Sequence, residues 1–465
     1  DHIVGVSFAA NLEKAVYVPI RHSYLGLSPE EQMDPQEFFT ILGGQLKNRL
    51  IVGHNLKFDL AFLAEEGVEA GAELFDTLIA AYVIDPTRSN SLKNLGKELF
   101  NFEVSEYKEV AGSSSFASVD LAAATQYACQ DTLLTLHLYE HLRQALQEHK
   151  LDNLFSSLEM PLIKILLGME KAGIKLNEQY LHNLSNELGD RLVELEASIH
   201  AHAGRIFNIN STKQLQEVLF TDLGLEPPKK TKTGFSTDSE VLQRLAFAHP
   251  ICKDLLEFRE LAKLKSTYAE TLAQLVNHKT HLIHASFNQA VTATGRLSSS
   301  NPNMQNIPIK TEWGRKIRRA FLPPFAGHKF LSIDYSQIEL RLLAHFSQDP
   351  GLVDAYRHGT DIHAMTAGRI FKKDPAEVSS FERNVGKTVN FGILYGISAH
   401  GLAEDLAISR PQAKEYIDSF YNGFAGVTEF FEEVLEQARA TGEVETLLGR
   451  VRRLPDINSK KFQIR

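Results

Sequence analysis

Four side chains that suit a nucleoside triphosphate recur at intervals of four in ERNVGKTVNFGILYG, residues 382–396. They are Arg383, Lys387, Phe391 and Tyr395. Because four residues turn an α-helix by about 400°, the set stays on one face about 120° wide. Arg and Lys suit phosphates, and each aromatic ring can stack on a base at about 1–3 kcal/mol. The spacing is equally typical of an amphipathic helix whose aromatic residues pack in the core.

A single carboxylate, Asp334, follows the apolar run FLSI, residues 330–333, and precedes an amphipathic helical pattern. We expect the run to be a strand, whose carboxyl end would hold Asp334 as a metal ligand. Ser336 and Glu339 have the S-x-x-E spacing of a capping box and predict the start of the helix. An aspartate that only caps a turn explains Asp334 as well.

Two segments are rich in cations. Residues 293–321 contain one acid, Glu312, and interleave amides and hydroxyls with basic side chains. These basic residues are Arg296, Lys310, Arg315, Lys316, Arg318 and Arg319. The mixture favours a surface that follows a nucleic-acid backbone. Residues 225–237, LEPPKKTKTGFST, predict a mobile basic loop. Its lysines are Lys229, Lys230 and Lys232. A solvated basic face without a partner is the alternative for both segments.

The negative charge is confined to the first third of the chain. Residues 1–150 hold 11 Lys and Arg against 21 Asp and Glu, whereas residues 151–465 hold 38 against 37. The asymmetry indicates two separate tasks. In the acidic part, Tyr127 and Asp131 lie one helical turn apart, and Asp59 ends the stretch GHNLKFD. A tyrosine and a carboxylate so spaced can position a water molecule beside a metal ion.

The hydrophobic pattern predicts several domains. The 465 residues allow two to four domains at about 100–200 residues each. Strands are expected over 3–10, 14–20 and 49–55, and a long helix over 118–149. Residues 158–279 read as mostly helical, 281–310 as β-rich, and 351 onward as helical again. Because no apolar run approaches the roughly 20 residues of a membrane span, we expect a cytoplasmic protein without membrane contact.

Together these segments resemble the family A DNA polymerases. DYSQIELR resembles motif A, RNVGKTVNFGILYG resembles motif B, and TGRLSSSNPNMQNIP is similar to the template-primer segment. Residues 1–150 are similar to the attached 3′–5′ exonuclease domain. The resemblance implies an α/β plus α+β multidomain fold, in which an RNase H-like exonuclease precedes a right-hand polymerase. The implied parts are the exonuclease over 1–150, the start of the polymerase region and thumb over 151–280, the palm over 281–350 and the fingers over 351–465.

The resemblance also implies an activity, namely template-directed transfer of nucleotides from dNTPs to a primer 3′-hydroxyl, with proofreading. The implied partners are primer-template DNA and dNTPs, the cofactor is Mg²⁺ in two-metal sites, and the expected state is a monomer. Asp334 would hold both polymerase metal ions with the Tyr335 carbonyl. Glu339 would be the steric gate against a ribose 2′-hydroxyl, a role that competes with the capping box.

Further roles follow from the same resemblance. Lys387 would also protonate the departing pyrophosphate, and Phe391 in place of Tyr implies discrimination against dideoxynucleotides. The other implied nucleotide-binding residues are Arg383, His363, Tyr395, Gln337 and Glu339. The implied primer and template contacts are Arg296, Gln305, Asn306 and Arg341. The lysines of the 225–237 loop are added to the predicted DNA contacts because of their charge, not because of the resemblance. Motif B departs from the family pattern at Asn384, where Arg is customary, and at Gly386, where Ala is common. Glycine within a helix costs up to about 1 kcal/mol.

In the exonuclease-like part, Asp59 and Asp131 match two of four acidic metal ligands, and Tyr127 matches the tyrosine that orients water. The other two acids belong to a strand that precedes residue 1 in relatives, and the second polymerase carboxylate belongs to a turn well beyond residue 465. We therefore expect an internal fragment in which each site lacks about half its metal ligands. Two alternatives stay open: a non-catalytic fragment that binds template-primer DNA, and a 3′–5′ exonuclease only.

Overall fold

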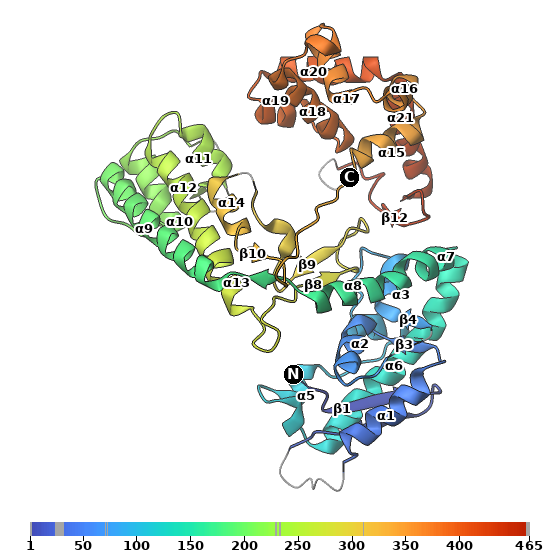
Figure 1. Cartoon of the computed structure of the whole chain (residues 1–465). Helices are drawn as coiled ribbons and strands as arrows, with labels where there is room; N and C mark the ends of the chain where they lie inside the picture. Colours follow the sequence, from blue (N-terminus) through green and yellow to red (C-terminus); the bar gives the residue numbers. More distant parts are fainter. Residues whose placement is uncertain are drawn as a thin grey trace. The chain divides into compact units, whose positions relative to one another are not determined.

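The computed structural model describes residues 2–23, 32–69, 71, 73–227, 230–231, 234–309 and 311–461, with backbone alone at 230–231. Contacts between Cα atoms divide the chain into two compact units, Asp1–Phe330 and Leu331–Arg465. The elements of both units are labelled in Figure 1.

The first unit begins with two short pairs of strands. Strand β1 (Gly5–Ala9) pairs antiparallel with β2 (Ala15–Pro19), and β3 (Ile51–Gly53) pairs parallel with β4 (Leu74–Asp76). The three predicted strands are confirmed, although β3 is short and only half-buried. The long predicted helix is confirmed as α6 (Leu121–Glu148), which packs on β1, β2 and β3. Leucines recurring every four residues form its buried face.

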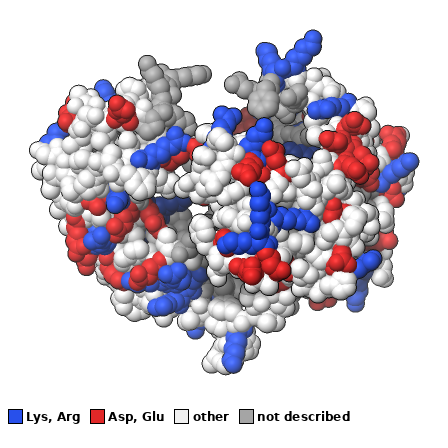
Figure 2. Space-filling view, turned by 90° about the horizontal axis from the view of Figure 1, so that it is seen from above, with Lys and Arg blue, Asp and Glu red and all other residues white. Residues whose placement is uncertain are grey.

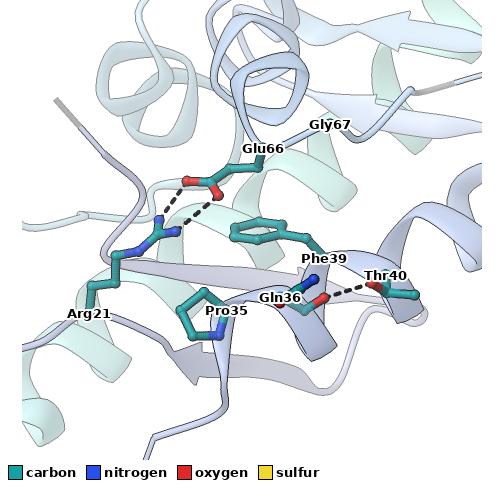
Figure 3. Close-up of a pocket in the computed structure, with 7 residues that line it drawn as sticks. All are labelled: Arg21, Pro35, Gln36, Phe39, Thr40, Glu66 and Gly67. Atoms are coloured by element: carbon teal, nitrogen blue, oxygen red, sulfur yellow. Dashed lines mark hydrogen bonds and ion pairs between the residues drawn. The ribbon is translucent and has the colours of Figure 1, made fainter.

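An ion pair closes a cavity beside these strands (Figure 3). Arg21, just after β2, bonds both carboxylate oxygens of Glu66 at 2.5 and 2.9 Å. Glu66 follows α2 (Leu56–Glu65), and the guanidinium lies 5.8 Å from the centre of the Phe39 ring on α1 (Pro35–Leu46). The hydrogen bond from Arg21 lowers the pKa of Glu66. The pair therefore ties β2 to the end of α2.

The middle of the first unit is helical, as predicted. Helices α9 (Glu178–Ala203) and α12 (Ile251–Leu264) run side by side in Figure 1 and share one core. Leu181, Leu184 and Leu188 are buried in it, and each buried leucine contributes about 1.5–3 kcal/mol. The other elements of this unit are α3 (Thr77–Ile84), α4 (Leu92–Phe100), α5 (Tyr107–Ala111), α7 (Asp152–Leu154), α8 (Met160–Ala172), β5 (Lys175–Leu176), α10 (Thr212–Gln216), β6 (Lys230–Thr231), β7 (Gly234–Phe235), α11 (Ser239–Leu245), α13 (Thr271–Gln274), β8 (Ser286–Asn288), β9 (Ser298–Ser300), α14 (Glu312–Arg318) and β10 (Phe321–Leu322).

The second unit is mainly helical, again as predicted, and ends in a hairpin that the sequence patterns did not predict. Helices α17, α18, α19 and α20 cluster around one core (Figure 1). Its elements are α15 (Ile338–Ser347), α16 (Pro350–His358), α17 (Ile362–Phe371), α18 (Ser380–Leu394), α19 (Ala399–Leu406), α20 (Arg410–Gly423), α21 (Ala425–Thr441), β11 (Glu443–Glu445) and β12 (Val451–Arg453).

Three local predictions are wrong. Residues 330–333 form no strand, because no strand of the described residues pairs with them and an unpaired strand leaves its backbone groups unbonded. The side chains of Phe330, Leu331 and Ile333 are accordingly exposed. Helix α15 begins at Ile338, and its N-cap residue Gln337 is in the left-handed conformation at φ 51°, so Ser336 and Glu339 form no capping box. In the expected β-rich passage 281–310, the described residues form the hairpin of β8 and β9 and one isolated bridge, from Ile283 to Ile174.

Among the described residues, none of the helices combines the length and apolar character that crossing a membrane requires.

A buried carboxylate joins two helical elements of the second unit. Asp349 is 3% exposed, caps α16 by accepting from Leu352 N at 3.1 Å, and accepts from Gly426 N in α21 at 3.0 Å. We expect Asp349→Ala to lower the free energy of unfolding by about 2–4 kcal/mol, because it leaves two N–H groups without acceptors. Chemical denaturation measures this.

The matched control is Asp354→Ala, which removes an exposed carboxylate of the same helix. It should change the free energy of unfolding by less than about 0.5 kcal/mol. Equal effects of the two substitutions would contradict the role given to Asp349.

Candidate nucleotide and nucleic-acid sites

The predicted stripe of cations and aromatics faces outward on α18. A capping box begins the helix: Ser379 N donates to Glu382 at 2.9 Å, and Glu382 N donates to Ser379 at 3.2 Å. The buried face is a different set of residues, namely Val385, Gly386, Val389, Asn390 and Ile393. Arg383 and Phe391 are partly exposed, Lys387 is exposed, and Tyr395, just after the helix, is 65% exposed. The alternative in which the aromatics form the core is therefore wrong.

Helix α18 approaches α17 closely at Gly386. A Cβ at this position would overlap the carbonyl oxygen of His363 and lie 3.0 Å from the backbone nitrogen of Ala367. Glycine is thus required by the separation of the two helices, and the packing offsets its low helix propensity. The departure from Ala in motif B has this structural reason.

The contact places His363 of α17 against the base of the stripe. His363 is 3% exposed, and its Nδ1 lies 3.0 Å from Nδ2 of Asn390. The hydroxyl of Thr366 donates to Oδ1 of Asn390 at 2.8 Å. Burial lowers the pKa of His363, against the effect of nearby Asp361. Its ring centre lies 5.8 Å from that of Phe391, so the structure brings His363 together with the predicted stripe.

Arg383 is oriented by Asp361, a residue that the sequence analysis missed. Nε of Arg383 donates to Asp361 Oδ2 at 2.6 Å, while Asp361 Oδ1 caps α17 by accepting from His363 N at 2.9 Å. Burial opposes ionisation of Asp361, but the hydrogen bonds from Arg383 and the helix outweigh it and lower its pKa. The signal that could have revealed Asp361 is its N-cap position before the helix.

Motif A meets motif B through one hydrogen bond. The hydroxyl of Tyr395 donates to Glu339 Oε1 at 3.0 Å. Nearby, Tyr356 of α16 donates to Gln337 Oε1 at 3.1 Å, and its ring centre lies 4.5 Å from the guanidinium of Arg341. Burial raises the pKa of Tyr356 to about 12. Tyr356, also missed by the sequence analysis, therefore positions two of the predicted site residues.

Asp334 and Tyr335 lie in an irregular, exposed stretch before α15. Within the part of the chain that the structure describes, no three His, Cys, Asp or Glu side chains converge to hold a metal ion. The described residues alone therefore do not fit a two-metal site, either at Asp334 or around the predicted acids Asp59 and Asp131.

The predicted template-primer residues of the first unit lie in a loop braced from several sides. Thr292 donates to the backbone oxygen of Arg296 at 2.6 Å, and Gln305 donates to Leu297 O at 3.0 Å. The backbone oxygen of Asn306 accepts from Tyr268. Tyr82, on the exonuclease-like helix α3, donates to Thr292 O at 2.8 Å, so side-chain hydrogen bonds hold this segment together with the ladder of β8 and β9.

The structure describes only some of the residues that were predicted to form cationic surfaces. Lys229, Lys232 and Lys310 lie outside the described residues, and only the backbone of Lys230 is described, in β6. Lys316 forms an ion pair with Glu187 and lies 4.1 Å from the centre of the Trp313 ring, whereas the remaining cations of α14 and its end are exposed. These are Arg315, Arg318 and Arg319. On the face shown in Figure 2, basic and acidic side chains are interspersed.

The exonuclease-like region contains two pairs of perturbed groups, Asp59 with Asp76 and Tyr127 with Asp131. Asp59 is exposed at the surface, yet the protein atoms around its carboxyl group and the neighbouring charge of Asp76 raise its pKa to about 7. Burial raises the pKa of Asp131 to about 6, opposed by a hydrogen bond from Tyr127. Burial and Asp131 raise the pKa of Tyr127 to about 12. Tyr127 and Asp131 thus share one face of α6 and interact there, whereas their role beside a metal ion stays a prediction.

Asp76 is a buried carboxylate that the sequence analysis missed. It is 2% exposed and accepts from Asn55 N at 3.0 Å, Leu56 N at 2.7 Å and Leu78 N at 2.9 Å. It therefore holds the first turns of both α2, which carries Asp59, and α3. Burial raises its pKa to about 6 against these hydrogen bonds. An aspartate between a strand and a helix is the signal that could have found it.

Comparison with known proteins decides the family. Residues 178–465 match the model described as DNA polymerase family A, and residues 7–147 match the model of a 3′–5′ exonuclease. The chain belongs to DNA polymerase family A. The predicted order of this family A chain, an exonuclease domain followed by a polymerase domain, is confirmed.

The family A chain is similar to bacterial enzymes named DNA polymerase I. It is 41% identical to that of Chloroflexus aurantiacus over 98% of this chain and 49% of the relative. It is 40% identical to that of Pseudomonas aeruginosa over 100% of this chain and 52% of the relative. The chain thus spans about half the length of these relatives.

A solved structure also matches, titled "POL domain of Pol1 from M. smegmatis complex with DNA primer-template and dNTP". The match has a TM-score of 0.84 and 33% identity, and covers 100% of this chain and 77% of that chain.

The close contact of α17 and α18 predicts that Gly386→Ala destabilises the folded protein. The added methyl group must displace α18 from the carbonyl of His363, so the free energy of unfolding should fall by about 1–3 kcal/mol. Urea denaturation measures this. Gly168→Ala is the control, because that helical glycine of α8 has open space around its Cβ position. The control should be neutral or stabilising by up to about 1 kcal/mol; a Gly386→Ala protein as stable as the control would refute the tight contact.

Asp76 predicts a pH dependence of stability. Its folded pKa of about 6 lies above the ordinary 3.8, so the folded state binds the proton more tightly. The contribution of Asp76 to stability is therefore complete below pH 3.8 and is lost as the pH rises through about 6, on the order of 3 kcal/mol in total. Denaturant titrations at pH 4.5 and 7.5, in the presence of a chelator, should show a smaller pH dependence in Asp76→Asn.

The control for this experiment is Asp120→Asn, at the exposed N-cap of α6. This variant should retain the pH dependence of the unmodified chain. If Asp76→Asn also retained it in full, Asp76 would not be the titrating group.

Proposed function

We propose that the whole protein extends DNA primers on a template and proofreads them. This chain spans about half the length of the relatives that it matches. The observation that carries this proposal is the outward stripe on α18, with His363 beside it and Glu339 bonded to Tyr395. Supporting it, the similar structure of 33% identity is of a polymerase domain in complex with primer-template and dNTP.

In the proposed reaction the primer 3′-oxygen forms a bond to the α-phosphorus of a dNTP, and the bond from that phosphorus to pyrophosphate breaks. Arg383, Lys387 and His363 bind the triphosphate, and Lys387 gives a proton to the departing pyrophosphate. Phe391 and Tyr395 pack at the sugar and base, and Glu339 excludes a 2′-hydroxyl. The support is that His363 of α17 lies beside Phe391 of α18 and that Tyr395 is bonded to Glu339 of α15.

The DNA contacts of the proposal come from both units. Arg296, Gln305 and Asn306 bind primer and template from the braced loop, and Arg341 from α15. We extend this role to Lys229, Lys230 and Lys232 on the basis of their charge. The loop's fixed geometry supports the first three assignments, because an ordered segment loses little conformational entropy on binding.

We propose a divalent cation, Mg²⁺, for the whole protein, because polymerase and exonuclease domains of this family generally use divalent ions. Asp334 with the Tyr335 carbonyl, and Asp59 with Asp131, offer the oxygen ligands that Mg²⁺ prefers. Since the described residues do not form a complete metal site, no step above depends on the cation.

A second candidate function is binding of template-primer DNA without turnover. The observation in its favour is that Asp334 is exposed and no group of three metal-ligating side chains forms among the described residues. A third, exonuclease activity alone, leaves the stripe on α18 without a role.

Primer extension distinguishes the first two functions. A labelled primer-template with Mg²⁺ and four dNTPs is incubated with the chain, beside DNA-binding titrations at two salt concentrations. We expect salt-sensitive binding, with Asp334→Ala leaving it unchanged. Extension that Asp334→Ala abolishes supports catalysis by the chain itself, and binding without extension supports the second function for the chain. Absence of DNA binding would contradict both.

A nucleotide-binding measurement tests the stripe directly. Lys387→Ala should raise the Kd for dATP at least about tenfold, because a charge-assisted phosphate contact is worth about 1.5–3 kcal/mol. Lys414→Ala, an exposed lysine of α20, is the control of equal charge change and should leave the Kd unchanged. Equal Kd values for the two variants would contradict the proposed phosphate site.

A further inference from the structure

Two buried polar side chains meet His363 where α17 and α18 touch. Asn390 is 0% exposed and Thr366 is 1% exposed. A buried amide that lacked partners would cost about 1–3 kcal/mol, and here both ends of the Asn390 amide have one, Thr366 at 2.8 Å and His363 at 3.0 Å. Neither residue belongs to the outward stripe of α18. Asn390 lies on the buried face of α18, and Thr366 is a buried residue of α17.

The chemistry of the amide determines the direction of the bond to His363. An amide NH₂ group donates hydrogen bonds and has no acceptor capacity. Because Nδ2 of Asn390 faces Nδ1 of His363, that ring nitrogen must accept and cannot carry a proton. In this orientation the Thr366 hydroxyl donates to Oδ1 of the same amide; an amide rotated by half a turn would require the hydroxyl to accept and Nδ1 of His363 to donate. A neutral imidazole with a bare Nδ1 carries its proton on Nε2.

The other ring nitrogen remains available as a donor. No described residue has a hydrogen bond to Nε2 of His363, and the buried unpaired atoms of the described residues are His22 Nδ1 and Gln130 Oε1. Nε2 of His363 therefore has some access to the surface. The charged groups that face the ring are Asp361, which favours the imidazolium, and Arg383 and Lys387, which oppose it. Burial adds to the two cations and favours the neutral ring.

We propose that Asn390, held by Thr366, is a positioning residue that fixes His363 in the Nε2–H tautomer and so presents one N–H donor to a phosphate oxygen of the nucleotide. This inference rests on the proposed function, because the phosphate site is part of it. A ring free to exchange tautomers would present a bare nitrogen to the phosphate part of the time and would repel it. Asn390 and Thr366 remove that state without touching the nucleotide.

The tautomer is tested without any nucleotide. The chain is labelled with ¹⁵N-histidine, and the His363 signals are assigned by their loss in His363→Gln. We expect a protonated Nε2 and an unprotonated Nδ1 at pH 7.5, and a mixture of tautomers in Asn390→Leu. A ring of the unmodified chain protonated at Nδ1, alone or together with Nε2, overturns the inference.

Equilibrium dialysis of dATP with Mg²⁺ tests whether the Nε2–H tautomer of His363 contributes to nucleotide binding. Asn390→Leu should raise the Kd about three- to tenfold, the equivalent of one lost hydrogen bond. Thr366→Val, which keeps the side-chain shape and serves if Asn390→Leu fails to fold, should raise it about two- to threefold. Thr388→Val is the matched control on α18, because its hydroxyl bonds only the Asn384 backbone oxygen at 3.1 Å; its Kd should not change.

A double substitution separates positioning from general damage. In the His363→Gln background, Thr366→Val should leave the Kd unchanged, because the group that it positions is gone. An equal rise in Kd with and without His363 would mean that Thr366 acts on the fold alone and would overturn the inference. So would an unchanged Kd in both Asn390→Leu and Thr366→Val. If dATP fails to bind the unmodified chain, the proposed function fails, and the NMR result still decides the tautomer.

Discussion

The second unit depends on how closely α17 and α18 approach each other. Gly386 allows the backbone of one helix to touch the carbonyl of His363 on the other, and an added Cβ would separate them. That separation sets the geometry of the buried Thr366, Asn390 and His363 network, because hydrogen bonds of about 3 Å tolerate little displacement. The opposite face of α18 is then free to carry Arg383, Lys387 and Phe391. A single missing side chain thus underlies both the interior and the surface of the candidate nucleotide site.

In the first unit, buried charged groups hold neighbouring elements together. Asp76 joins the first turns of α2 and α3 through backbone N–H donors. Further along α2, Lys57 forms an ion pair with Glu170 of α8 and donates to Phe287 O at 2.5 Å, while Phe287 N donates to Glu170 at 2.6 Å. Removing either Lys57 or Glu170 would leave the other charge largely buried and unpaired, which would lower the free energy of unfolding. These contacts tie the exonuclease-like region to the hairpin that leads into the template-primer loop.

Much of the candidate site follows from local periodicity, and the failures follow from its limits. The spacing of Arg383, Lys387 and Phe391 predicted a shared helix face without deciding that it points outward, and the four-residue spacing placed Tyr127 and Asp131 on a common face. The apolar run before Asp334 did not become a strand, since a strand needs a partner that no local pattern supplies. The S-x-x-E pattern failed because Gln337 takes the left-handed conformation at the helix start, which spacing cannot reveal.

The sequence by itself determined the family resemblance, the order of the two domains, most helices and the residues that share a helix face. The positions of the helices and their shared faces depend on contacts within a few residues, where helix geometry fixes the distances. The tertiary structure alone decided that Tyr395 bonds Glu339, 56 positions away, that Asn390 bonds His363, 27 positions away, and that Asp76 holds Asn55, 21 positions away. Such pairs form only after helices pack, because packing, and not spacing along the chain, sets the distance between them.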